Sequence, residues 1–408
     1  MRKSIRLGIY LHYTHYGNNK YTFINAEGIT FIQKAALSDE ISLLASVIRN
    51  TELSENDFRI VLEKDGIKVH SLPGWKDLPA SILSIPFSLK SLIKTIKKFV
   101  TESDLIWLRI PSAVAFIVYS IAKKTGKPII IHVAGNILLT PRPEKYKGIK
   151  LFFVKIVSLL LHQVTKFMTR NALVLVAGGE LRSLLHKPHH PAYLFDDTLI
   201  TQKDLIPPLK KQGHAKNILF VGRFDFGKGI KLLINAIATL KKEFPEITLR
   251  MAGTGTLYSE VEQYIQKKNL NTNIELLGFV PSNGPLQKLY READIAVIPS
   301  DSYPEGFPRV ILEAWAAGLP IIATKFAGIP YTVVDKKNGL LIPPGNLQKL
   351  IEALKNLILN DKLRYNIAQG GSKTVSTLTM EHQRKKIHTL LNKQFPGLQL
   401  PDYSKKQT

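Results

Sequence analysis

Residues 294–313 read DIAVIPSDSYPEGFPRVILE, and this stretch decides the fold class. The apolar run at 294–300 predicts a buried parallel strand, and the residues after the loop predict a helix. With about 3.6 residues per turn, Glu313 is expected about two turns into that helix, while Glu305 lies in the loop. Ligands of open parallel sheets bind outside the carboxyl ends of the strands, so both carboxylates are expected at such an edge.

The same stretch combines two kinds of binding group. Carboxylates accept hydrogen bonds from sugar hydroxyls, while the backbone amides of Gly306 and Phe307 precede a helix. A helix N-terminus favours phosphate because its amides are unpaired and its dipole end is positive. Together these groups offer both halves of a nucleotide-sugar site.

A second signal lies upstream, where residues 217–221 predict a strand and residues 222–229 read GRFDFGKG. Arg223 and Lys228 supply fixed positive charge, and the three glycines let the backbone approach a bulky anion. An arginine fork and a lysine point charge suit a pyrophosphate leaving group.

In this order, the two motifs resemble the retaining GT-B glycosyltransferases of family 4, also described as glycosyl transferases group 1. The family pattern is Gly-Arg, a few residues, Lys-Gly, and much later Glu-Gly-Phe, five residues, Glu. The resemblance is strong over residues 217–360 and holds only in outline over 1–195. It implies an α/β fold with two Rossmann-like βαβ domains facing a cleft.

The resemblance also implies roles for these residues. Arg223 and Lys228 would hold the donor diphosphate, and Glu313 would bind the ribose hydroxyls. Glu305 would bind the transferred sugar, with the Gly306 and Phe307 amides at the sugar or phosphate. Arg223 and Lys228 would replace a metal ion, and no cofactor is expected beyond the nucleoside diphosphate sugar itself. No Asp-x-Asp triplet occurs in the chain, which is consistent with metal independence.

Three further positions follow from the resemblance. The loop at Phe279 and Val280 would hold the nucleobase largely through backbone, and His132 matches a family histidine near sugar and phosphate. A histidine that ends an apolar strand is also often a hydrogen-bonded core residue, so this alternative stays open. Gly253 and Gly255 are interpreted as a tight turn beside the nucleotide.

Composition sets the wider limits. The chain has 408 residues, a formal net charge of +24, 45 % hydrophobic residues and no cysteine, so disulfides and thiolate sites are excluded. The charge favours anionic partners, which are anionic lipid, nucleic acid or the nucleotide diphosphate; a merely solvated basic surface is the alternative. No run approaches the ~18–20 uninterrupted apolar residues of a membrane span. The expected location is cytoplasmic.

Strands are expected at 5–11, 58–62, 104–109, 128–133, 172–176 and 192–195, and again at 217–221, 247–252, 274–280, 295–299, 321–324 and 340–342. Strands alternating with helices predict parallel sheets. The predicted domains are 1–195 on the acceptor side, a linker at 196–215, a donor domain at 216–372, and a C-terminal helix and basic tail at 373–408. The C-terminal helix is expected to return to the first domain.

Two helical stretches, 89–100 and 149–168, combine large apolar residues with lysines. Basic amphipathic helices lie on anionic membranes, but a helix that packs its stripe on a sheet has the same pattern. The hypothesis is that both stretches contact an anionic bilayer at the inner face of the plasma membrane.

The predicted function is retaining, metal-independent transfer of a sugar to an acceptor hydroxyl. The acceptor is expected to be a glycan or a lipid-linked molecule in bacterial surface polysaccharide, lipopolysaccharide or glycolipid assembly. The rivals are a phosphorylase or hydrolase of the same fold, an inactive sugar-nucleotide-binding partner, and a basic nucleic-acid-binding protein. The last is disfavoured because Glu305 and Glu313 would repel a phosphate backbone.

Overall fold

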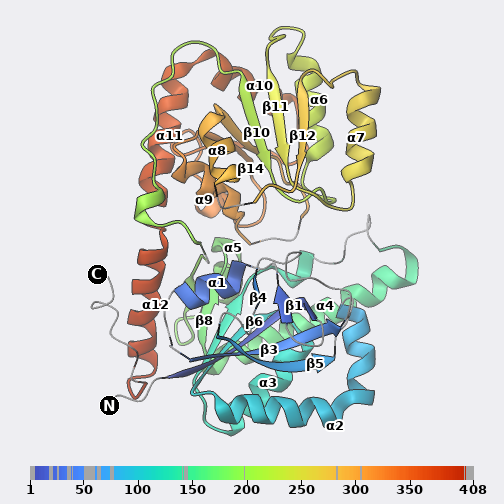
Figure 1. Cartoon of the computed structure of the whole chain (residues 1–408), viewed down its shortest axis with the longest axis vertical. Coiled ribbons are helices and arrows are strands. Elements are labelled where there is room, and N and C mark those ends of the chain that lie inside the picture. Colours follow the sequence, from blue (N-terminus) through green and yellow to red (C-terminus); the bar gives the residue numbers. More distant parts are fainter. Residues whose placement is uncertain are drawn as a thin grey trace. The chain divides into compact units, whose positions relative to one another are not determined.

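The chain forms two compact α/β units, seen in a computed structural model (Figure 1). The first unit comprises Met1–Ala177, Leu181–Leu199 and Glu381–Thr408, and the second Gly178–Glu180 and Ile200–Met380. The structure describes residues 5–17, 22–24, 27–34, 38, 40–49, 60–61, 66–73, 78–139, 141, 146–196, 198–281, 284–303, 306–398 and 400. The predicted α/β class with two Rossmann-like sheets is confirmed.

The second unit contains a six-stranded parallel sheet of order β12-β11-β10-β13-β14-β15. Along the chain, β11 and β12 add to one side of β10, whereas β13, β14 and β15 add to the opposite side. The strand order therefore reverses between β10 and β13, which makes this position a topological switch point. The strands are β10 (Asn217–Val221), β11 (Thr248–Ala252), β12 (Ile274–Gly278), β13 (Ile295–Ile298), β14 (Ile321–Thr324) and β15 (Leu340–Ile342).

Helices bury both faces of this sheet, so its strands are apolar almost throughout. One core cluster joins β10 and β11 to several amphipathic helices, and a second surrounds the fully buried Trp315. The helices are α6 (Ile230–Leu240), α7 (Tyr258–Lys267), α8 (Pro285–Glu292), α9 (Arg309–Ala316), α10 (Leu347–Leu359) and α11 (Asp361–Val375).

The first unit has a nine-stranded sheet in its described part. Its parallel strands run in the order β5-β3-β1-β6-β7-β8-β9, while β2 pairs antiparallel with β1 and β4. The strands are β1 (Arg6–Gly17), β2 (Thr22–Ile24), β3 (Glu40–Arg49), β4 (Ile60–Val61), β5 (Lys68–Pro73), β6 (Leu105–Ile110), β7 (Ile129–Val133), β8 (Leu173–Val176) and β9 (Ala192–Leu194).

The sequence prediction omitted three strands of this sheet, the short antiparallel β2 and the parallel β3 and β5. The middle of β3, Leu43-Leu44-Ala45, consists of residues with high helix propensity. It is a strand because it pairs with β1 and β5 on either side, which local sequence does not reveal. The six-residue β5 ends in a proline and pairs with β3 alone among the described strands, as an edge strand does.

The helices of the first unit differ in how they use their apolar residues. They are α1 (Glu27–Lys34), α2 (Leu78–Glu102), α3 (Ala113–Lys124), α4 (Gly148–Met168), α5 (Gly179–Leu185, which lies in this unit from Leu181) and α12 (Met380–Gln394). In α12, Ile387 and Leu391 are fully buried, and Gln383 accepts a hydrogen bond from the Asp196 amide. The C-terminal helix therefore groups with the first unit, as expected.

For residues 89–100 the core alternative is confirmed. The stripe of α2 packs into the first core, with Leu92, Ile96 and Phe99 completely buried. In contrast, residues Gly148–Asn171 are long and apolar enough to cross a membrane by length and composition. Counting uninterrupted apolar residues missed this stretch because Lys150, Lys155 and Lys166 divide it.

Candidate functional site

The loops after β10 and β13 meet at the switch point of the second sheet. The Gly227 carbonyl accepts hydrogen bonds from the amides of Asp301 (2.9 Å) and Tyr303 (3.3 Å). Gly229 adopts a positive φ of 68°, and a Cβ there would lie 2.0 Å from the Pro299 carbonyl oxygen. Only glycine allows this approach, so the two loops are packed backbone to backbone.

Arg223 is held in place by one carboxylate although its side chain is 69 % exposed. Its Nε donates to Asp225 Oδ2 at 2.7 Å. Asp225 Oδ1 in turn accepts from the Thr256 amide (3.1 Å) and hydroxyl (3.0 Å). Burial raises the pKa of Asp225, but the bonds from Thr256 and Arg223 outweigh it and leave that pKa below its usual value. The carboxylate therefore stays ionised and anchors the guanidinium.

Lys228 lies on the same loop and faces the loop after β13. Its Nζ is 4.1 Å from the centre of the Tyr303 ring, well within the ~6 Å range of a cation–π contact. Its amide donates to the Asp225 carbonyl at 3.3 Å. Two fixed positive charges thus lie on one glycine-rich turn at the carboxyl edge of the sheet.

The loop after β11 completes this edge. A Cβ on Gly253 would lie 1.9 Å from the Gly222 carbonyl oxygen, and one on Gly255 would lie 2.6 Å from that of Phe224. The Gly253 amide donates to the Gly278 carbonyl at 2.7 Å. Close packing therefore explains both glycines, and their place beside a nucleotide stays a prediction.

Phe279 and Val280 follow β12 at the same edge of the sheet. The Phe279 side chain is 74 % exposed, and Val280 is half-buried. An exposed aromatic ring beside a glycine-rich edge suits contact with a planar base. The predicted role of this loop in holding a nucleobase remains a prediction.

Glu313 lies nearer the start of its helix than predicted. Since α9 begins at Arg309, Glu313 is in the second turn rather than two turns in, because the loop extends further than the sequence suggested. Tyr290 Oη donates to Glu313 Oε2 at 2.8 Å. Burial and this carboxylate raise the pKa of Tyr290 well above its usual value, so the hydroxyl keeps its proton.

Sequence reasoning missed Tyr290 because the tyrosine lies far along the chain from Glu313 and within a polar helix. Its side chain is only 3 % exposed, despite a neighbourhood of charged residues in α8. A buried tyrosine generally needs a partner for its hydroxyl, and that requirement was the one available signal.

The structure describes the remaining predicted residues of the loop before α9 less fully. Glu305 lies outside the described residues. The Gly306 carbonyl accepts from the Gly328 amide at 2.8 Å, and the Phe307 side chain packs in the core at 9 % exposure. Phe307 therefore fixes the start of α9 from the inside.

His132 lies in β7 of the first unit and is 2 % exposed. Its ring packs edge-on against Trp107 and Phe195, at centroid distances of 5.9 and 5.4 Å. These surroundings are those expected for the core alternative, and its role beside a sugar stays a prediction.

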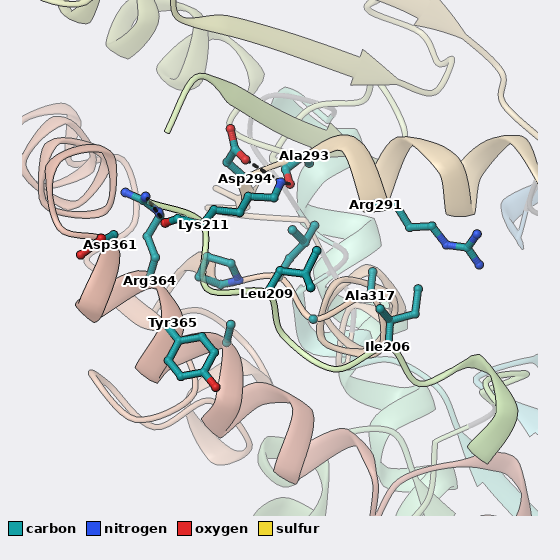
Figure 2. Close-up of a pocket in the computed structure, with 14 residues that line it drawn as sticks. Ile206, Leu209, Lys211, Arg291, Ala293, Asp294, Ala317, Asp361, Arg364 and Tyr365 are labelled. Atoms are coloured by element: carbon teal, nitrogen blue, oxygen red, sulfur yellow. Dashed lines mark hydrogen bonds and ion pairs between the residues drawn. The ribbon is translucent and has the colours of Figure 1, made fainter. Parts of the chain in front are cut away.

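A cavity of about 200 Å³ lies at the opposite, amino-terminal edge of the second sheet (Figure 2). Figure 2 shows Lys211 reaching Asp294, with Nζ 2.7 Å from Oδ1. Arg364 donates to backbone carbonyls of the linker and of α10. The charged groups of this cavity therefore fasten the linker to the second unit, and the cavity is separate from the glycine-rich edge.

Comparison with known proteins points to the same family that the sequence motifs resemble. The family described as glycosyl transferases group 1 matches residues 201–374. An uncharacterized glycosyltransferase of Methanocaldococcus jannaschii is 37 % identical over 40 % of this chain and 44 % of its own length. A D-inositol 3-phosphate glycosyltransferase of Corynebacterium diphtheriae is 28 % identical over 43 % of this chain and 42 % of its own length. The chain thus matches less than half the length of these relatives.

Solved structures resemble the whole fold. Anabaena HepE in complex with UDP has a TM-score of 0.68 at 17 % identity, covering 95 % of this chain and 100 % of its own. A glycosyltransferase from Rickettsia africae has a TM-score of 0.68 at 16 % identity, covering 97 % and 99 %. At such identities the likeness concerns the fold. The chain therefore has the GT-B fold, and residues 201–374 within its second half match the family of glycosyl transferases group 1.

Proposed function

We propose that this chain transfers a sugar from a nucleoside diphosphate sugar to an acceptor hydroxyl, with retention of the anomeric configuration and without a metal ion. One observation carries the proposal. Arg223 and Lys228 project from a single glycine-rich turn at the switch point of a parallel sheet, each held by a neighbouring side chain. This is where such sheets bind ligands, and positive charge there suits a diphosphate.

The proposed chemistry exchanges one carbon–oxygen bond for another and transfers one proton. The bond between the sugar C1 and the diphosphate oxygen breaks, while C1 bonds to the acceptor oxygen on the same face. The acceptor proton passes to the departing phosphate oxygen. Arg223 and Lys228 stabilise the negative charge that develops on the diphosphate, Glu313 binds the ribose and Glu305 the transferred sugar.

The donor and acceptor are proposals at the level of class. Crystals of the structural neighbour HepE hold UDP and UDP-glucose, so these are the first ligands to test. One curated relative bears the name of a putative colanic acid biosynthesis glycosyltransferase. In line with that name, we propose a glycan or lipid-linked acceptor in surface polysaccharide or glycolipid assembly, reached from the cytoplasm.

The proposal is tested by the configuration of the product. A thermal-shift panel of uridine, guanosine and adenosine diphosphate sugars identifies the donor, since ligands that bind the native state raise its Tm. Proton NMR of the product, formed from that donor with a panel of glycan and glycolipid acceptors and excess chelator, is expected to show the donor's anomeric configuration. Inverted product, or activity abolished by the chelator and restored by manganese, would contradict the proposal.

Tyr290 is expected to act as a positioning residue through Glu313. Tyr290→Phe removes the hydrogen bond to Glu313 Oε2. Such a bond contributes about 1 kcal/mol, so the donor KM should rise roughly fivefold while kcat stays nearly constant. Glu313→Gln should also raise KM, and Tyr290→Phe should have little additional effect in that background. Tyr264→Phe, which loses a hydroxyl bonded to Asn235, is a matched control and should leave KM unchanged.

A further inference from the structure

Among the residues whose exposure is described, α4 exposes more large apolar side chains than any other helix of the first unit. Six large side chains of this helix are each 38 % to 75 % exposed. They recur at helical spacing over three turns and form one continuous stripe. We call this stripe the α4 outer face; its residues are Ile149, Phe152, Phe153, Ile156, Leu159 and Leu160.

Soluble proteins rarely expose so many large apolar residues together unless the patch binds something. The charged residues that α4 itself contributes are all of one sign. Exposed basic residues accompany it, and α4 contains no acidic residue. These basic residues are Lys147, Lys150, Lys155 and Arg170. An apolar stripe bordered by lysines is complementary to lipid tails beneath anionic headgroups.

The opposite side of α4 is buried within the first unit. Ser158, His162 and Thr165 are buried against the rest of the first unit. Near its end, the Phe167 ring packs on Tyr119, and Lys123 Nζ lies 5.4 Å from the centre of that ring. Crossing a bilayer would detach this polar face and place it in hydrocarbon. The helix is therefore suited to lie within the interface plane with only its outer face inserted.

We infer that the α4 outer face docks this protein onto an anionic lipid bilayer. A second copy of the chain is a poorer occupant, because pairing two such faces would bring together basic borders of molecules that each carry a net charge of +24. The inference gives the proposed function a partner, since docking would bring a lipid-linked acceptor to the enzyme. Docking itself needs neither donor nor acceptor.

Vesicle flotation tests the inference on the full chain. Binding to phosphatidylcholine vesicles is expected to strengthen as phosphatidylglycerol is added and to weaken with salt, because exposed charges are screened within ~10 Å at 0.1 M. Phe152→Glu/Phe153→Glu should weaken binding at least about tenfold, since it places charge in the inserted stripe. The matched control is Leu359→Glu, which alters a residue 51 % exposed at the end of α10 and should bind as the parent does.

Lysine variants separate α4 from α2. Lys150→Gln/Lys155→Gln should lower affinity for anionic vesicles by up to about 25-fold, as each surface lysine contributes about a factor of five near such a leaflet. Lys94→Gln/Lys97→Gln removes the same charge from exposed positions of α2, whose apolar stripe is buried. This second pair should have the smaller effect. Equal losses from the two pairs would mean that charge alone attracts the protein, and would overturn the assignment to α4.

The absence of cysteine allows a direct measurement of insertion. Phe153→Cys labelled with nitrobenzoxadiazole should show brighter, blue-shifted emission on anionic vesicles, while labelled Lys94→Cys should not. Unchanged emission at position 153, or a concentration-dependent dimer in light scattering that the α4 glutamate variant abolishes, would overturn the inference. Nucleoside diphosphate binding by the same variants, expected to match the parent, shows whether the donor site is intact independently of docking.

Discussion

Replacing both Arg223 and Lys228 with alanine is expected to lower turnover by about 10²–10³-fold, the usual effect of removing a group that stabilises charge in the transition state. The diphosphate gains negative charge as the sugar departs, and these two side chains are the basic groups on the turn that meets β13. Initial-rate kinetics with the identified donor measure the effect. Affinity for the free nucleoside diphosphate, measured by calorimetry, should fall too, because charged hydrogen bonds contribute roughly 1.5–3 kcal/mol each.

Two controls separate this effect from a change in net charge or folding. Lys231 lies nearby at the start of α6, and its side chain pairs with Glu260. Lys231→Ala should leave turnover unchanged. Arg223→Lys keeps the charge but loses the planar fork that Asp225 holds, so an intermediate loss is expected. Undiminished diphosphate affinity in both single alanine variants would show that Arg223 and Lys228 do not hold the diphosphate.

The second large effect concerns stability. Arg364→Met should lower the free energy of unfolding of the second unit by about 3 kcal/mol, because buried carbonyls would lose a charged donor. Arg364 is 6 % exposed, and its guanidinium donates to the carbonyls of Leu357 (2.7 Å) and Ile358 (2.9 Å). These carbonyls belong to the last turn of α10, where helices leave acceptors unpaired.

The same guanidinium also donates to the linker carbonyls of Lys211 (3.2 Å) and Gly213. Urea unfolding followed by circular dichroism measures the loss. Arg291→Met is the matched control, since Arg291 lines the same cavity but is exposed, and it should change stability by less than about 0.5 kcal/mol. Equal stability of both variants would show that the carbonyls find other donors and that Arg364 does not fasten the linker.

The sequence by itself determined most of the second unit. Its six strands fall where periodicity placed them, because buried parallel strands are short apolar runs bounded by turn residues. Arg223 and Lys228 could be selected because each lies beside glycines whose backbone requirement is local, and Glu313 because it follows Gly306 and Phe307 at the spacing of the family motif. Such requirements leave a signal within a few residues of the functional side chain.

Only the tertiary structure decided what depends on residues distant in sequence. Glu313 meets Tyr290, and Arg364 meets the linker, through contacts that no local pattern encodes. The helices α2 and α4 carry the same lysine-edged apolar pattern, yet one stripe is buried and the other exposed. An amphipathic helix specifies that it has an apolar face, whereas what covers that face is decided by whether the rest of the fold provides a surface against it.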